Sequence, residues 1–159
     1  MSIEDSIFVL STHSPREIAA SYCQLLYDDY EIKEAGGLLH QERVTVERQR
    51  ISIDALRYYS PERIKQVKLD TLGFDPNLMI AIFYVKPLLE IEEHRNDILR
   101  GAAGLIKTVN CSLAVSFEDM YVLSYHEGVL MLMENPHLKY WTEDRLLLFA
   151  GIPYKFKSP

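Results

Sequence analysis

Apolar residues along this chain follow two different periods, one typical of strands and the other of helices. Residues 78–85 are apolar without interruption, which predicts a central strand covered on both faces. Residues 112–117 alternate, and we expect Leu113, Val115 and Phe117 to share one face of a strand. Further strands are predicted at residues 7–10, twice within 38–53, and at 120–125 and 129–134.

Two longer helices are predicted from a start signal and from apolar spacing. Ser14, Pro15 and Glu17 combine a capping box with proline at the first helical position, so we expect a helix to begin there. Apolar residues recur every three or four positions over residues 88–109, which predicts the longest helix of the chain. These two helices are the main candidates for covering a sheet.

Shorter helices are predicted after Ser60-Pro61 and after Thr142, where a capping residue precedes apolar positions at helical spacing. Gly101 and Gly104 lie inside the long helix and lower its intrinsic propensity by roughly 1 kcal/mol each relative to alanine. We expect these glycines to let the helix lie close to the sheet.

The order of the predicted elements favours an α+β fold in a single domain, residues 1–159. Residues 3–60 and 72–134 each run strand, helix, strand, strand, and a short helix follows at 142–150. The late strands are joined by turns too short for parallel crossovers. We therefore expect one largely antiparallel sheet with two main helices on one face.

Composition and charge narrow the class of protein. The chain has 159 residues and a formal net charge of −6, which argues against a nucleic-acid partner and fits an acidic surface for a basic protein. Cys23 and Cys111 lie far apart in the sequence, which fits a reducing compartment. The acidic N-terminus does not resemble a signal peptide, and the apolar run at 78–85 is too short to cross a bilayer. We expect a cytoplasmic protein without a membrane anchor.

Candidate catalytic and metal-binding groups are scattered. On the long helix, His94 has Glu90 four residues before it and Asp97 three after, but no second pair of ligands is spaced to complete a metal shell. Cys111 lies beside apolar residues and is expected in the core. The other histidines stand alone at turns or strand ends, at positions 13, 40, 126 and 137. We expect no catalytic residue, metal or cofactor.

The C-terminal half resembles a known family. The features that carry the resemblance are residues 72–76 before the apolar strand, the long helix, the strands around 121–123 and 126–132, and the segments 141–148 and 153–154. Over about residues 72–154 the chain resembles the swarm-inhibition type (Sit) immunity proteins of bacteria. It departs from that pattern after residue 130, where Met131–Glu134 precede Asn135-Pro136.

The resemblance implies a non-enzymatic protein that binds a cognate polymorphic toxin and blocks it by occlusion. No toxin-contacting residues are carried over from the family, so candidate contacts come from charge alone: Asp28, Asp29, Glu31, Glu34, Glu118, Asp119 and Glu127. Acidic loops would steer a basic toxin and speed its association. Two alternatives remain open: a ligand-binding or enzymatic domain with a pocket between helix and sheet, and a homodimer that covers the second face of residues 78–85.

Overall fold

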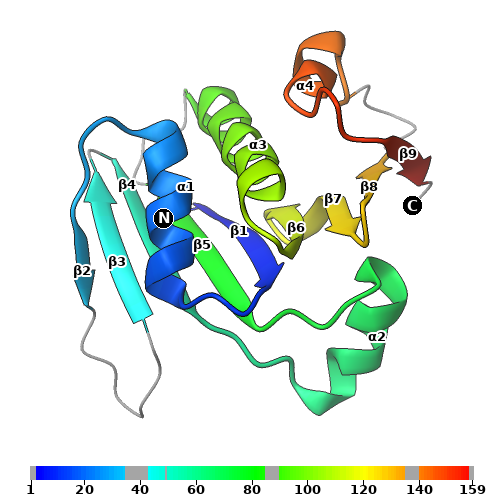
Figure 1. Cartoon of the computed structure of the whole chain (residues 1–159), viewed down its shortest axis with the longest axis horizontal. Helices are drawn as coiled ribbons and strands as arrows, with labels where there is room; N and C mark the ends of the chain where they lie inside the picture. The colour runs from blue at the N-terminus through cyan, green and yellow to red at the C-terminus, as the bar shows by residue number, and fades with distance from the viewer. Residues whose placement is uncertain (1–2, 35–42, 49, 85–89, 135–139, 158–159) are drawn as a thin grey trace.

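The computed structural model describes residues 3–34, 43–48, 50–84, 90–134 and 140–157. The described residues form one sheet of nine strands with four helices (Figure 1). In chain order the elements are β1 (Ile3–Leu10), α1 (Pro15–Leu26), β2 (Ile32–Glu34), β3 (Arg43–Arg48), β4 (Ile51–Arg57), α2 (Glu62–Leu72), β5 (Leu78–Tyr84), α3 (Ile91–Thr108), β6 (Ser112–Phe117), β7 (Met120–His126), β8 (Val129–Met133), α4 (Glu143–Leu147) and β9 (Tyr154–Lys157).

The strands lie in the order β2-β3-β4-β5-β1-β6-β7-β8-β9. Every neighbouring pair is antiparallel except β8 and β9, which run parallel. The predicted α+β class and the largely antiparallel single sheet are confirmed. The two edge strands, β2 and β9, were not predicted, because each is too short to show an apolar period of its own.

The two halves of the chain fill the sheet in opposite directions. After α1, the chain reaches the outer edge at β2 and returns inward through β3 and β4. After α3, it starts beside the centre at β6 and moves outward through β7 and β8. The first strands of the halves, β1 and β5, pair with each other at the centre. Each half has the predicted strand-helix-strand order, but they are not superimposable copies.

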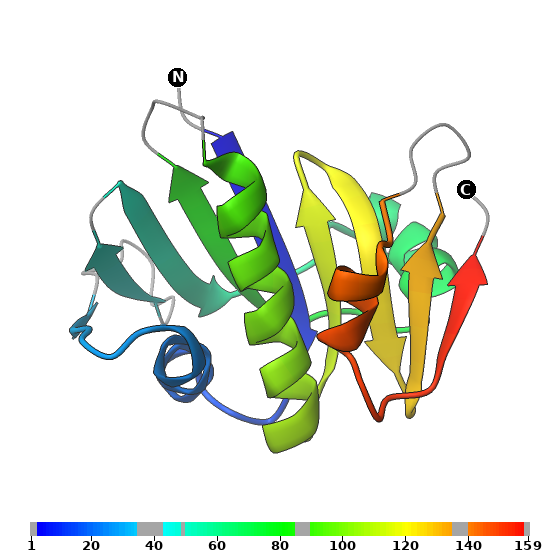
Figure 2. The same ribbon diagram turned by 90° about the horizontal axis from the view of Figure 1, so that it is seen from above.

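Helices α1 and α3 lie side by side on one face of the sheet, as predicted (Figure 2). Every second residue of the central strands faces these helices and is buried, so the main core lies in this layer. Its largest fully buried side chains include Ile7, Ile18, Tyr22, Ile53, Ile80, Ile82, Ile98, Leu99, Leu105 and Leu113.

The strand β5 is covered unevenly. Leu78, Ile80 and Ile82 face the helices and are 2% exposed or less. Met79 and Phe83 on the other face are only half-buried. The uninterrupted apolar run therefore reflects one fully covered face and one that is partly open.

The glycines of α3 serve the contact between α1 and α3 rather than a contact with the sheet, which corrects the sequence-based expectation. A Cβ atom built on Gly101 would lie 2.4 Å from the ring of Tyr22, and one on Gly104 would lie 2.4 Å from Leu25. Tyr22 and Leu25 both belong to α1. The absence of side chains at these two positions allows the helices to approach each other.

The predicted capping residues behave differently at the two Ser-Pro sites. The Ser14 hydroxyl accepts a hydrogen bond from the Glu17 amide at 3.2 Å, and the Glu17 carboxylate accepts one from the Ser14 amide at 3.1 Å. This confirms the capping box of α1. In contrast, Ser60 does not cap α2, whose N-cap residue is Pro61, and the buried Ser60 hydroxyl has no hydrogen-bond partner among the described residues.

Helix α2 lies on the opposite face of the sheet from α1 and α3 (Figure 2). The ammonium of Lys68 in α2 lies 4.0 Å from the ring centroid of Phe8, whose neighbours Ile7 and Val9 face the other helices. Gly73 ends α2 in a left-handed conformation with φ of 86°. This helix covers only part of the second face of the sheet.

The last helix, α4, is joined to the core by Trp141. The side chain of Thr142 accepts a hydrogen bond from the Arg145 amide at 3.4 Å, which confirms the predicted cap. Trp141 is 6% exposed, and its indole N–H donates to the carbonyl oxygen of Met133 at 3.0 Å. Its ring meets that of Phe149 edge-on. The tryptophan therefore connects the C-terminal segment to β8.

Candidate functional site

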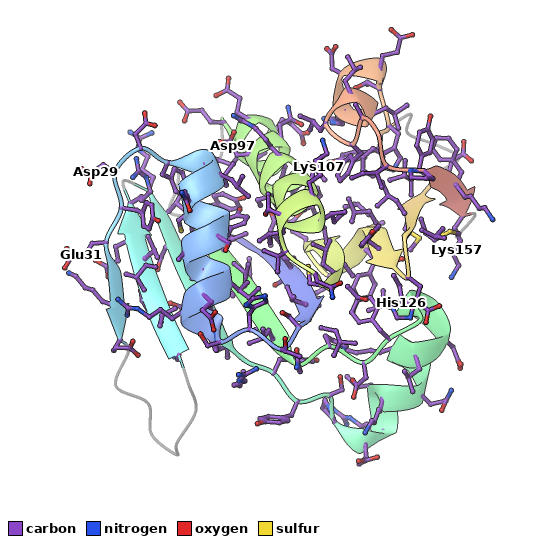
Figure 3. All side chains as sticks on the ribbon, in the orientation of Figure 1. Asp29, Glu31, Asp97, Lys107, His126 and Lys157 are labelled. Carbon is purple, nitrogen blue, oxygen red and sulfur yellow. The ribbon has the colours of Figure 1, made fainter. Side chains whose placement is uncertain are left out.

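The clearest candidate interaction surface is the acidic segment, defined as residues 28–34, between α1 and the edge of the sheet. Figure 3 shows Asp29 and Glu31 at the outer side of the molecule, beside β2. The carboxylates of Asp28, Asp29 and Glu31 are exposed. Among the described residues, no side-chain ion pair involves these three groups. The segment therefore presents unneutralised negative charge to solvent.

Two arginines bind the acidic segment without neutralising all of it. The guanidinium of Arg48 donates to the backbone carbonyl oxygen of Asp29 and lies over the ring of Tyr27, 4.3 Å from its centroid. Arg16 forms an ion pair of 2.8 Å with Glu34. Since Arg48 contacts the backbone and not the carboxylate, it holds the segment in place and leaves the Asp29 charge free.

The other acidic candidates lie far from this segment. Glu118 and Asp119 form the turn between β6 and β7, and β6 lies five strand spacings from β2. At about 4.8 Å per spacing, this separation is on the order of 24 Å. Glu127 follows the opposite end of β7, roughly 26 Å from Asp119 along the strand. The seven predicted contact residues thus occupy three separate places and do not form one patch.

Glu118 belongs to an ion-pair network, centred on the buried Asp5, that the sequence did not predict. Asp5 in β1 is fully buried, and its carboxylate accepts two hydrogen bonds from Arg95 of α3, at 3.1 and 3.2 Å. Arg95 also donates to Glu118 at 3.2 Å, and the Glu118 amide donates to Asp5 at 3.1 Å. The network joins the long helix to the β6–β7 turn, so the Glu118 carboxylate has a structural partner.

A sequence signal for this network exists. Asp5 shares its strand face with Ile7 and Val9, because side chains two apart in a strand point the same way. An ionised carboxylate on a core-facing position requires a buried cationic partner. The alternation of side chains along this strand therefore indicates that Asp5 has a cationic partner, although it does not identify Arg95.

The candidate metal ligands on α3 do not converge. The His94 imidazole lies 3.9 Å from Glu90, but the Asp97 carboxylate instead pairs with Arg100. The His94 ring stacks on Tyr84, with ring centroids 5.2 Å apart. Within the part of the chain that the structure describes, no group of three or more His, Cys, Asp or Glu residues is placed to hold a metal ion.

Both cysteine thiols are held in their protonated form. Burial raises the pKa of Cys23 and of Cys111 to about 11. Cys23 is fully buried in the main core, and Cys111 is half-buried against it. A thiol with a raised pKa is a poor nucleophile at neutral pH.

The described histidines at strand ends and turns have local partners. His126 accepts or donates a hydrogen bond at 2.8 Å with the Ser112 hydroxyl, and its ring packs against Phe74 at a centroid distance of 5.6 Å. His13 lies 3.3 Å from the carboxylate of Glu17. His40 and His137 lie outside the described residues. The His126 contacts connect the segment after α2 to the sheet.

Comparison of this chain with protein-family models, with curated proteins and with solved structures finds no match. The resemblance to the Sit immunity proteins therefore stays a prediction made from the sequence. None of the described helices combines the length and the apolar character needed to cross a lipid bilayer.

Proposed function

We propose that this chain is a bacterial immunity protein that binds a cognate toxin domain and blocks it by occlusion, without catalysing a reaction. The family resemblance over residues 72–154 supports the class of function. The acidic segment, residues 28–34, supports the place of contact. In this proposal the protein acts in the cytoplasm of the cell that it protects, and its toxin is a basic domain.

The observation that carries the proposal is the exposure of three carboxylates on an anchored segment. Asp28, Asp29 and Glu31 face solvent, while Arg48 fixes the backbone at Asp29. A charged surface that is already ordered before binding loses little conformational entropy when its partner arrives. Its field also raises the rate of encounter with a basic partner, by about tenfold or more at low ionic strength.

The test uses as its ligand the product of the neighbouring gene, which this proposal expects to be the toxin. We expect a stable complex, protection of cells that express both proteins, and an association rate that falls steeply as salt is added. In the triple variant Asp28→Asn, Asp29→Asn, Glu31→Gln, the association rate should fall by roughly tenfold or more.

A second variant, Asp119→Asn with Glu127→Gln, removes two carboxylates at the other candidate positions and serves as the control, to be compared also with the double variant Asp28→Asn, Asp29→Asn. Its association rate should stay near that of the unmodified protein. If only this control loses binding, the contact surface is assigned wrongly. If the unmodified protein neither binds the toxin nor protects the cell, the proposed function itself is wrong.

A further inference from the structure

A hollow of about 260 Å³ lies on the second face of the sheet, beside α2. Its floor is formed by Ser6, Phe8 and Met79 on the central strands and by Ser116 on β6. This volume is below the roughly 300–1,000 Å³ typical of sites for drug-sized ligands. The hollow therefore suits a small molecule.

One wall of the hollow contains a buried lysine. Lys68 of α2 is 8% exposed, and its ammonium lies 4.0 Å from the ring centroid of Phe8 and 4.5 Å from that of Tyr58. Within the described residues, no carboxylate lies within ion-pair distance of this ammonium. Two aromatic faces stabilise the cation, but they leave its hydrogen-bond donors available to the hollow.

The opposite end of the hollow is acidic. Glu4 and Asp119 line it there, and both are exposed. Glu4 lies four residues before Phe8 in β1, which corresponds to about 13 Å along the strand. Asp119 lies at this same end. It belongs to the turn that follows Phe117, and Phe117 pairs with Asp5, the residue next to Glu4. The hollow thus has a cationic, aromatic end and an acidic end.

Hydroxyl groups occupy the middle of the hollow. Ser6 and Ser116 are directly paired across β1 and β6, so their side chains lie next to each other on this face. The Ser6 hydroxyl donates to the Glu4 carboxylate at 3.5 Å. Tyr121 follows on β7 as the partner of Ser116. A polar ligand that spans the hollow would meet hydrogen-bonding groups along its length.

We propose that this hollow is a binding site for a small zwitterion of amino-acid to short-peptide size. The carboxylate of the ligand binds Lys68, its cationic group lies between Glu4 and Asp119, and its polar backbone follows Ser6 and Ser116. The site lies on the opposite face of the sheet from α1 and α3. It therefore represents a second function that does not depend on toxin binding.

The test is a titration followed by amide chemical shifts and by calorimetry. The probes are L-lysine, glycyl-L-lysine and triglycine, with acetate and ethylammonium as probes that carry only one of the two charges. We expect at least one zwitterion to shift the amide signals of Ser6, Phe8 and Ser116 and to bind more tightly than either single-charge probe.

Three variants define the site. Lys68→Met retains a long side chain against the two rings but removes the charge, and it should weaken zwitterion binding by about tenfold or more. Glu4→Gln with Asp119→Asn changes only exposed groups and should also weaken binding. Lys107→Met removes an exposed lysine from α3 on the other face (Figure 3) and should leave binding unchanged.

Three outcomes would overturn the proposal: no probe shifts the amides that line the hollow, acetate binds as tightly as the zwitterions, or both site variants bind as tightly as the unmodified protein. Because the double variant at Glu4 and Asp119 alters only exposed side chains, it remains informative even if Lys68→Met does not fold.

Discussion

The guanidinium of Arg95 on α3 donates two hydrogen bonds to the carboxylate of Asp5 in the central strand β1. Asp5 is fully buried, so removal of its charge leaves the guanidinium without its main counter-charge in the core. We expect Asp5→Asn to reduce the free energy of unfolding by about 3 kcal/mol, measured by urea denaturation.

The exposed ion pair between Arg16 and Glu34 provides the matched comparison. Solvent screens this pair, and Arg16→Gln should change the free energy of unfolding by less than about 1 kcal/mol. Equal effects of the two substitutions would show that burial of the Asp5–Arg95 pair has no energetic consequence.

Two glycines of α3 should respond differently to substitution by alanine. A Cβ at Gly101 would lie 2.4 Å from the ring of Tyr22, which is 1% exposed and has no room to move. Overpacking of this kind costs roughly 1–3 kcal/mol, more than alanine gains in helix propensity. Gly101→Ala should therefore lower the midpoint of thermal unfolding.

At Gly104, the close neighbour is Leu25, which is 39% exposed and able to change rotamer. Here the gain of about 1 kcal/mol in helix propensity should balance or exceed the cost of the contact. Gly104→Ala should leave thermal stability unchanged or raise it. A large loss at Gly104 together with none at Gly101 would contradict the packing of α1 against α3.

The two Ser-Pro sites provide another paired test. Ser14→Ala removes the side chain that caps α1 and should cost about 1 kcal/mol. Ser60→Ala removes a buried hydroxyl that has no partner among the described residues, so it should be neutral or stabilising. Chemical denaturation of both variants, with circular dichroism of helix content, distinguishes the two roles.

Stability should fall in alkali because buried tyrosines resist ionisation in the folded chain. Burial raises the pKa of Tyr27 and of Tyr140 to about 12, whereas tyrosine in an unfolded chain ionises near pH 10. The unfolded chain therefore releases these protons first as the pH rises. The resulting stabilisation is complete below about pH 10 and is lost progressively between about pH 10 and 12.

The variant Tyr140→Phe tests this explanation. Its hydroxyl is buried without a hydrogen-bond partner among the described residues, so its removal should be neutral or stabilising at pH 7. Its loss of stability between pH 9 and about pH 12 should also be smaller than in the unmodified protein. Tyr59→Phe, at a position that is 75% exposed, is the control and should keep the original profile.

Local signals in the sequence predicted the local structure well. The capping box at Ser14 and the cap at Thr142 are formed as expected, and Leu113, Val115 and Phe117 share the face of β6 that packs into the main core. Each of these features depends on residues within a few positions of one another. A short stretch of sequence is therefore enough to predict each of them.

Features that depend on distant residues were not predicted. β9 pairs with β8 across the whole of α4, and a parallel pairing of this kind has no local signature. The partner of Asp5 lies 90 residues away. The acidic candidates were grouped by charge alone, but the strand order places Glu31 and Glu127 near opposite sides of the sheet. The hollow beside α2 likewise combines residues that are far apart in the sequence, from Glu4 to Tyr121.

The position of β1 has a consequence for how the protein is made. β1 pairs with β5 and with β6, so the middle of the sheet requires residues 3–10, 78–84 and 112–117 together. During synthesis, β1 leaves the ribosome more than a hundred residues before its partner β6. Pairing between strands that are so far apart in the sequence is slow, and the edges of the strands stay exposed until it is complete. We expect the nascent N-terminal half to depend on chaperones, because it cannot close its own sheet.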